Sequence, residues 1–265
     1  YTLLGFKANT NYSIDDLIYN VKNIHLNKKE TSYLKNNELT FLTNSNFKPF
    51  TMEIDNKLSG IEIEYIKLID KLLDKKIKIK IEEENKSKIN LIKNEQNSFK
   101  YLYSKVEAES NDFTSTEIIS EFKIAVATLN NMPFIDDIKQ LNNRTIAISK
   151  YSILSEKFKK QYPNIKFIET KNIYESFDLL SQKKIFAVVA KLPVLSYFIN
   201  NEGLTNIKIS GTFPETFQMK LLLNKNNEIL KNILNKAINQ ISDEDRFKIN
   251  SKFNLVKYEG YIDYS

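Results

Sequence analysis

The sequence predicts an α/β fold built as two lobes, and three observations support this prediction. Residues 136–189 alternate short apolar runs with segments of helical spacing, in the order strand, helix, strand, helix, strand. The last run, Ile185–Val189, is uniformly apolar, which indicates a strand covered on both faces and a mostly parallel sheet. Similar patterns precede and follow this block, so one α/β lobe is inserted between two segments of another. Such a layout favours a ligand clamp over an enzyme.

The individual elements follow from the same periodicity rules. Strands are short apolar or alternating runs, and helices carry apolar residues three or four positions apart. Ser242 with Asp245 three residues later forms a capping box that starts the last helix. In the first half of the chain we expect a short helix at 15–21, a helix-prone polar linker at 27–37, a strand at 39–43, a helix at 61–73, a strand at 77–81, a helix ending near 94, and strands at 101–103 and 124–128. In the second half we expect a strand at 144–148, a helix at 152–160, a strand at 165–168, a helix at 173–180, a strand at 185–189, a strand at 217–223, and helices at 227–241 and 242–253.

The expected lobes divide the chain into interleaved segments. Each lobe is predicted to be a mostly parallel sheet flanked by helices, and two crossing strands near Glu121–Phe122 and Phe213–Pro214 are expected to form a hinge. The predicted boundaries are a lead-in at 1–37, lobe 1 at 38–121 and 215–255, lobe 2 at 122–214, and a tail at 256–265.

Composition excludes several classes of function. The net charge of +6 comes from scattered lysines without a dense basic stripe, so nucleic-acid binding is not expected. The absence of cysteine excludes disulfides, thiolate catalysis and cysteine-based metal sites, and the single histidine, His25, lies in a polar stretch typical of a solvated side chain. No apolar run is long enough for a membrane span, and no export signal is visible. We expect no metal and no organic cofactor.

Several short motifs occur in a specific order and spacing. They are Phe47-Lys-Pro-Phe50, Gly60-Ile-Glu-Ile-Glu64, Phe113-Thr114, Leu141–Ile148 with Lys150, Tyr162–Ile165 and Ala187–Val189. Through them, residues 30–255 resemble the type 2 periplasmic binding proteins, in particular the family 3 solute-binding domains used in polar amino-acid uptake and as Venus-flytrap sensors of bacterial receptors. Residues 26–35 are similar to the linker that precedes such a domain in receptors, which favours a receptor over a transport subunit.

The resemblance implies a sensing domain outside the cytoplasm, in the periplasm, belonging to a kinase- or cyclase-type membrane receptor. Its expected partner is a small molecule, with membrane contact only through segments outside this chain and a possible homodimer in the full receptor. Two alternatives stay open. One is the substrate-binding protein of an uptake transporter, and the other is a periplasmic dehydratase-like enzyme in which Glu107 and Lys191 would be the acid–base pair.

Three departures from the family pattern concern the ligand. The loop Glu107–Asp112 has no Arg or Lys to bind an amino-acid carboxylate, and Lys191 replaces the acidic residue that receives the ligand ammonium. Lys150-Tyr151 stands where the family has Lys-Gly, which hinders the approach of a ligand to the backbone. The standard α-amino-acid site is therefore lost, and the domain binds a different small molecule or none.

The candidate ligand-binding residues lie where the carboxyl ends of parallel strands and helix N-termini are expected to meet, or where the resemblance places them. They are Phe47, Phe50, Glu107, Glu109, Lys150, Tyr151, Ser152, Thr170 and Lys191. Five of them have a plainer interpretation: Phe50 as packing under its loop, Glu107 and Glu109 as a solvated loop edge, Lys150 as a solvated lysine, and Lys191 as a solvated lysine that opens the next helix. Tyr103 and Phe113 are predicted to be core residues.

Overall fold

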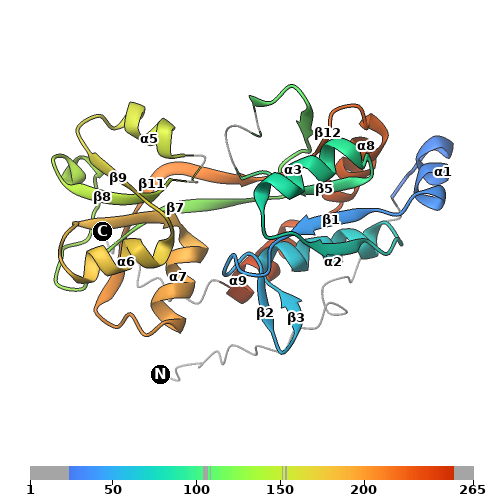
Figure 1. Ribbon diagram of the computed structural model, residues 1–265. Coiled ribbons are helices and arrows are strands. Elements are labelled where there is room, and N and C mark those ends of the chain that lie inside the picture. Colours follow the sequence, from blue (N-terminus) through green and yellow to red (C-terminus); the bar gives the residue numbers. More distant parts are fainter. Residues whose placement is uncertain (1–23, 104–106, 108, 151, 153, 254–265) are drawn as a thin grey trace, which may run out of the picture.

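A computed structural model describes residues 24–103, 107, 109–150, 152 and 154–253, and it arranges them in two α/β lobes (Figure 1). Each lobe is built on a five-stranded sheet, and two long strands, β7 (Ser120–Leu129) and β11 (Ile207–Met219), run between the lobes. The helix predicted at 15–21 lies outside the described residues. Among the described residues, no helix combines the length and apolarity needed to cross a bilayer.

Lobe 1 contains the sheet with strand order β4-β1-β5-β12-β6. Strand β1 pairs in parallel with β4 and β5, whereas β12 pairs antiparallel with β5 and β6. The elements of this lobe are α1 (Lys28–Asn36), β1 (Thr40–Thr43), β2 (Met52–Ile54), β3 (Lys57–Ser59), α2 (Ile61–Leu72), β4 (Lys78–Ile81), α3 (Asn85–Asn94), β5 (Ser98–Tyr101), β6 (Phe113–Ser115), β12 (Leu221–Asn224), α8 (Glu228–Ile238) and α9 (Asp243–Phe253).

Lobe 2 contains the sheet with strand order β11-β7-β10-β8-β9. Strand β8 pairs in parallel with β9 and β10, as predicted for this block, whereas β7 pairs antiparallel with both β10 and β11, so the sheet is mixed and not mostly parallel as expected. Besides β7 and β11, the elements are a 3₁₀ helix (η2, Ile138–Leu141), β8 (Thr145–Ser149), α5 (Ser155–Gln161), β9 (Lys166–Thr170), α6 (Ile173–Ser181), β10 (Ala187–Lys191) and α7 (Leu192–Asn201).

The crossing between the lobes is an antiparallel pair in which Phe217 lies opposite Phe122 and Met219 opposite Ser120. The pairing is irregular between Thr212 and Thr216, where the predicted crossing Phe213–Pro214 falls. The single strand predicted at 217–223 is wrong: β11 ends at Met219 and β12 begins at Leu221, in the other sheet. Phe217, Met219 and Leu221–Leu223 are all buried and apolar, so the hydrophobic pattern does not mark the point where the chain changes sheet.

The segment predicted to be a linker at 27–37 is instead a docked helix. Asn27 and Glu30 form a capping box at the start of α1, and Leu34 is buried in the core. Glu30 Oε2 accepts a hydrogen bond of 2.7 Å from Lys236 Nζ on α8. The β2–β3 hairpin was not predicted. Its turn is formed by Asp55 and Asn56, which both have positive φ, as a two-residue hairpin turn requires.

The loop that carries Phe47 and Phe50 is held directly over the start of α2. The amides of Ile61 and Glu62 donate hydrogen bonds of 3.1 and 2.9 Å to the carbonyls of Pro49 and Phe50. Gly60 makes this possible, because its φ is +122° and a Cβ there would lie 2.3 Å from the Phe50 carbonyl oxygen. The position of the Phe47–Phe50 loop therefore depends on a residue without a side chain at position 60.

We predict that Gly60→Ala destabilises the protein by more than the roughly 1–3 kcal/mol of backbone strain alone, because a backbone clash is added to the unfavourable φ. Gly203 is the matched control: its φ is +69°, and no atom lies within 4 Å of a Cβ placed there. Gly203→Ala should cost only about 1–2 kcal/mol. Urea unfolding of both variants measures the difference, and equal losses of stability would contradict this account of Gly60.

Candidate functional site

The carboxyl ends of the parallel strands of lobe 2 lie at one edge, as predicted. Ser149 at the end of β8 lies opposite Thr170 at the end of β9, and Lys191 ends the neighbouring strand β10. Thr170 is buried and its hydroxyl bonds to Ser176 Oγ at 2.7 Å, so it serves its own lobe. Ser152 Oγ accepts a hydrogen bond from the Leu154 amide, and Lys150 is exposed. Tyr151 lies outside the described residues.

Four aromatic rings gather at the edge of lobe 1 that faces lobe 2, and we call them the aromatic box: Phe47, Phe50, Tyr103 and Phe217. The Phe47 ring stacks on Phe50 with centroids 5.4 Å apart, and Tyr103 meets Phe47 edge-on at 5.1 Å. Phe50 is fully buried and also packs edge-on against Phe217 of the crossing strand, at 6.4 Å. Three rings come from lobe 1 and one from β11.

The side chain of Lys191 reaches from lobe 2 into this box. Its Nζ lies 3.9 Å from the Phe217 ring centroid and 4.9, 5.0 and 5.3 Å from the centroids of Phe50, Phe47 and Tyr103. Burial lowers the pKa of Lys191 to about 8, and the negative charge of Glu62 opposes this shift. Lys191 is therefore not the ordinary solvated lysine of the plainer interpretation. Phe217 was not among the predicted site residues, and Tyr103 was predicted to lie in the core.

Glu107 is not the solvated loop residue that was expected. The side chain is 2 % exposed, and its Oε1 accepts hydrogen bonds of 2.8 Å from Lys100 Nζ and 3.1 Å from Asn85 Nδ2. Its Oε2 accepts a third, of 3.2 Å, from the Tyr103 amide. The reason is that Lys100, on the buried strand β5, needs a buried counter-charge. Glu109 is exposed, as the plainer interpretation expected.

Glu62, on the first turn of α2, is a further buried acid that the sequence analysis did not select. Thr51 Oγ1 donates a hydrogen bond of 3.0 Å to Glu62 Oε2, while Oε1 is buried and has no hydrogen-bond partner among the described residues. Burial raises the pKa of Glu62 to about 7, against the opposing effects of the Thr51 hydrogen bond and the charge of Lys191. An acid inside the apolar stripe Ile61–Ile66 was the signal available in the sequence.

The two lobes also touch at a second place. Lys48 Nζ, in the loop of the aromatic box, lies 3.4 Å from Glu202 Oε1 at the end of α7 in lobe 2. The same ammonium lies 5.8 Å from the centroid of the Tyr197 ring on α7. Together with Lys191, this contact places the lobes against each other on the side of the aromatic box.

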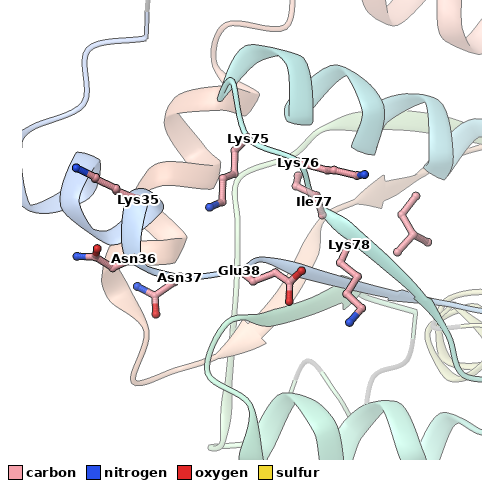
Figure 2. Close-up of a pocket in the computed structure, with 9 residues that line it drawn as sticks. Lys35, Asn36, Asn37, Glu38, Lys75, Lys76, Ile77 and Lys78 are labelled. Atoms are coloured by element: carbon pink, nitrogen blue, oxygen red, sulfur yellow. The ribbon is translucent and has the colours of Figure 1, made fainter.

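The arrangement does not assemble an acid–base pair from Glu107 and Lys191, because Glu107 is bound by Lys100 and the Lys191 ammonium lies among the rings. Within the described part of the chain, no three His, Cys, Asp or Glu side chains are placed to hold a metal ion. A hollow of about 660 Å³ in lobe 1, between residues 35–38 and 75–79, contains none of the predicted site residues (Figure 2). Lys75 in this hollow donates a hydrogen bond of 2.6 Å to the Leu34 carbonyl at the end of α1.

Comparison with known proteins gives one family match and several structural relatives. Residues 39–255 match the family described as bacterial extracellular solute-binding proteins, family 3. A search of curated protein sequences returned no match.

The structural relatives include both sensors and solute receptors. The periplasmic VFT2 domain of Bordetella pertussis BvgS is 18 % identical, with a TM-score of 0.77 over 86 % of this chain and 99 % of that one. The L-cystine solute receptor of Neisseria gonorrhoeae, in an unliganded open conformation, is 22 % identical, with a TM-score of 0.66 over 85 % and 96 % of the two chains. A histidine kinase sensor domain with similarity to periplasmic binding proteins is 13 % identical, with a TM-score of 0.66 over 82 % and 95 %. At these identities the likeness is one of fold.

We predict that Lys100→Met lowers the free energy of unfolding by about 3–5 kcal/mol, because it leaves the Glu107 carboxylate buried without its counter-charge. The double variant Lys100→Met with Glu107→Gln should recover much of this loss. The exposed pair Lys159–Glu169 is the control, and Lys159→Met should cost at most about 1 kcal/mol. The measurement is urea unfolding. A Lys100 variant as stable as the Lys159 variant would show that the buried pair is unimportant.

We also predict a pH-dependent stability that Glu62→Gln removes. The folded protein holds the Glu62 proton up to about pH 7, whereas the unfolded chain releases it near 4.5, so the stability of the wild type falls as pH rises between these values. At about 1.4 kcal/mol per pKa unit, the Gln variant should gain roughly 3 kcal/mol relative to the wild type across this range. Unfolding free energies at pH 4.5 and 8 test this, with the exposed Glu53→Gln as the control for loss of one charge. An equal pH slope in Glu62→Gln and wild type would contradict it.

Proposed function

The chain belongs to the bacterial extracellular solute-binding proteins of family 3, and we propose that it is the sensing Venus-flytrap domain of a bacterial membrane receptor, located in the periplasm. The observation that carries the proposal is the contact of Lys191, from lobe 2, with the aromatic box of lobe 1, next to the crossing strands. We also propose that lobe 1 consists of residues 38–121 and 215–255, and that lobe 2 consists of residues 122–214.

Sensing in such a molecule is a shift between open and closed arrangements of the lobes. The lobes share β7 and β11, and a ligand that contacts both lobes favours the closed arrangement by its difference in affinity for the two states. The irregular pairing between Thr212 and Thr216 is a place where the two strands can bend without breaking a regular ladder. The likeness to the BvgS domain and to a histidine kinase sensor domain supports this function.

The proposed ligand is not a standard α-amino acid. A ligand ammonium beside the aromatic box would meet the positive charge of Lys191 at close range. The described part of the loop at 107–112 offers no cation to bind a carboxylate, and Glu107 is already bound by Lys100. A ligand that binds at this site must either interact favourably with the positively charged ammonium group of Lys191 or displace it.

A second candidate is the solute-binding subunit of an uptake transporter. The observation that favours it is the fold likeness to the L-cystine solute receptor. The segment that forms α1 favours the receptor instead, because residues 26–35 resemble the segment that precedes such a domain in receptors. Gene sequence on both sides of this segment distinguishes them: a receptor is expected to show membrane spans with a kinase or cyclase domain.

We predict that locking the lobes together fixes the output of the full-length protein. The chain has no cysteine, so Lys48→Cys with Glu202→Cys introduces a thiol pair at the interlobe contact. Treatment with a short bis-methanethiosulfonate linker, which forms a reducible disulfide with each thiol and releases methanesulfinate, should hold kinase or cyclase output constant under conditions that otherwise change it, because closure is the signal. Autophosphorylation or cyclic-nucleotide production in membranes measures this, and reduction should restore the response.

The matched control is Lys159→Cys with Glu169→Cys, an ion pair of the same kind that lies within lobe 2. The linker at this pair should leave the response intact. If the interlobe lock changes no output but abolishes solute uptake, the receptor proposal is wrong and the transport candidate is correct.

A further inference from the structure

We propose that Lys191 acts as a tethered ligand, whose ammonium group occupies the aromatic box and closes the two lobes in the absence of any small molecule. This inference rests on the proposed flytrap function, because it names what fills the place between the lobes. It also assigns a ligand class to the box: a primary alkylammonium group, supplied by the chain itself.

Lys191 bridges the two lobes. Its backbone ends strand β10, which is paired with β7 and β8 inside the sheet of lobe 2. Its ammonium lies within 5.3 Å of three ring centroids of lobe 1, those of Phe47, Phe50 and Tyr103. Opening the lobes would withdraw the cation from these rings. A ligand bound between the lobes would likewise contact both of them and oppose their opening.

The box is built without the help of Lys191. Phe47 contacts both Phe50 and Tyr103, and Phe50 contacts Phe122 and Phe217 of the two crossing strands. Neighbouring rings hold these side chains in place, so the ring faces that attract a cation are organised before the cation arrives. Removal of the lysine amine should therefore leave an empty site of the same chemistry.

The Lys191 amine carries a positive charge inside the aromatic box. Among the described residues, no carboxylate forms an ion pair with Lys191, and Glu62 acts on it only through its longer-range negative charge. Glu62 is 2 % exposed and its Oε1 has no hydrogen-bond partner among the described residues. With a pKa of about 7 it is only partly ionised at pH 7, so it supplies a partial negative potential to the box and does not neutralise the cation directly. With a pKa of about 8, Lys191 is mostly protonated at pH 7. The rings therefore hold an ammonium ion.

The other interlobe ion pair is weaker. The side chains of Lys48 and Glu202 are 30 % and 33 % exposed, and pairs of this kind contribute little in water. A partly buried cation held against several aromatic rings contributes more. Lys191 is thus the stronger of the two contacts. Because it is tethered, it competes with free amines at a high effective concentration, so added amines should not displace it from the wild type.

The test measures the distance between the lobes with spin labels. Lys86 on α3 and Lys157 on α5 are exposed, and the two helices lie on the same side of the molecule in Figure 1, so Lys86→Cys with Lys157→Cys takes one label on each lobe. Without ligand, the reference protein should give one short distance. Lys191→Ala should reduce the ratio of closed to open molecules about tenfold and add a longer distance.

Chemical rescue makes the test specific for the ammonium group. Propylammonium replaces the atoms that Lys191→Ala removes, so millimolar propylammonium should restore the short distance in that variant and leave the reference protein unchanged. Propanol, of similar size but without charge, should not restore it. Lys191→Met, which keeps an apolar chain of similar length, should open like the alanine variant, with thermal unfolding as the check that each variant is folded.

Two outcomes would overturn the inference. One is an alanine or methionine variant as closed as the reference protein, and the other is equal rescue by propanol and propylammonium. These results are separate from those of the lobe-locking experiment. A receptor whose output responds to the lock, but whose lobes close without Lys191, would keep the proposed function and lose the tethered ligand.

Discussion

The pairing of β7 with β11 at the crossing between the lobes is the constraint on which the rest of this structure depends. Two sheets that each bury both faces are joined by these strands, and their register places Phe122 opposite Phe217 where the chain leaves one lobe for the other. Phe50 packs on both of these rings, and Gly60 allows the loop of Phe50 to lie over the start of α2. The aromatic box therefore forms at the crossing strands.

Buried charge is concentrated around this box. Lys100 and Glu107 form an ion pair whose side chains are each 1 % exposed, and the Tyr103 ring lies 5.4 Å from the Lys100 ammonium as well as near that of Lys191. Glu62 lies at the start of α2 behind the loop of Phe50. Each of these groups costs free energy to remove from water, and ionisable groups held in such environments are more frequent at functional sites than elsewhere. Their arrangement supports a site between the lobes that is maintained at the expense of stability.

Most helices and strands could be predicted from the sequence because hydrophobic periodicity reports local structure. The capping box of Ser242 and Asp245 forms as predicted, and the helix predicted to end near Asn94 ends there. The errors have a common cause in tertiary structure. The mostly apolar segment from Phe217 to Leu223 belongs to two sheets. The polar segment at 27–37 becomes a docked helix because Leu34 and Glu30 find partners on lobe 1.

The sequence by itself determined the fold class, the parallel strands β8, β9 and β10 and the fact that Lys191 ends a buried strand, since all three follow from which side chains avoid water. Only the tertiary structure decided what the charged residues contact. Glu107 turns inward to Lys100, and Lys191 enters a box whose rings come from positions 47, 50, 103 and 217. Residues this far apart in the chain are brought together by the crossing strands. Local sequence patterns do not predict such long-range contacts.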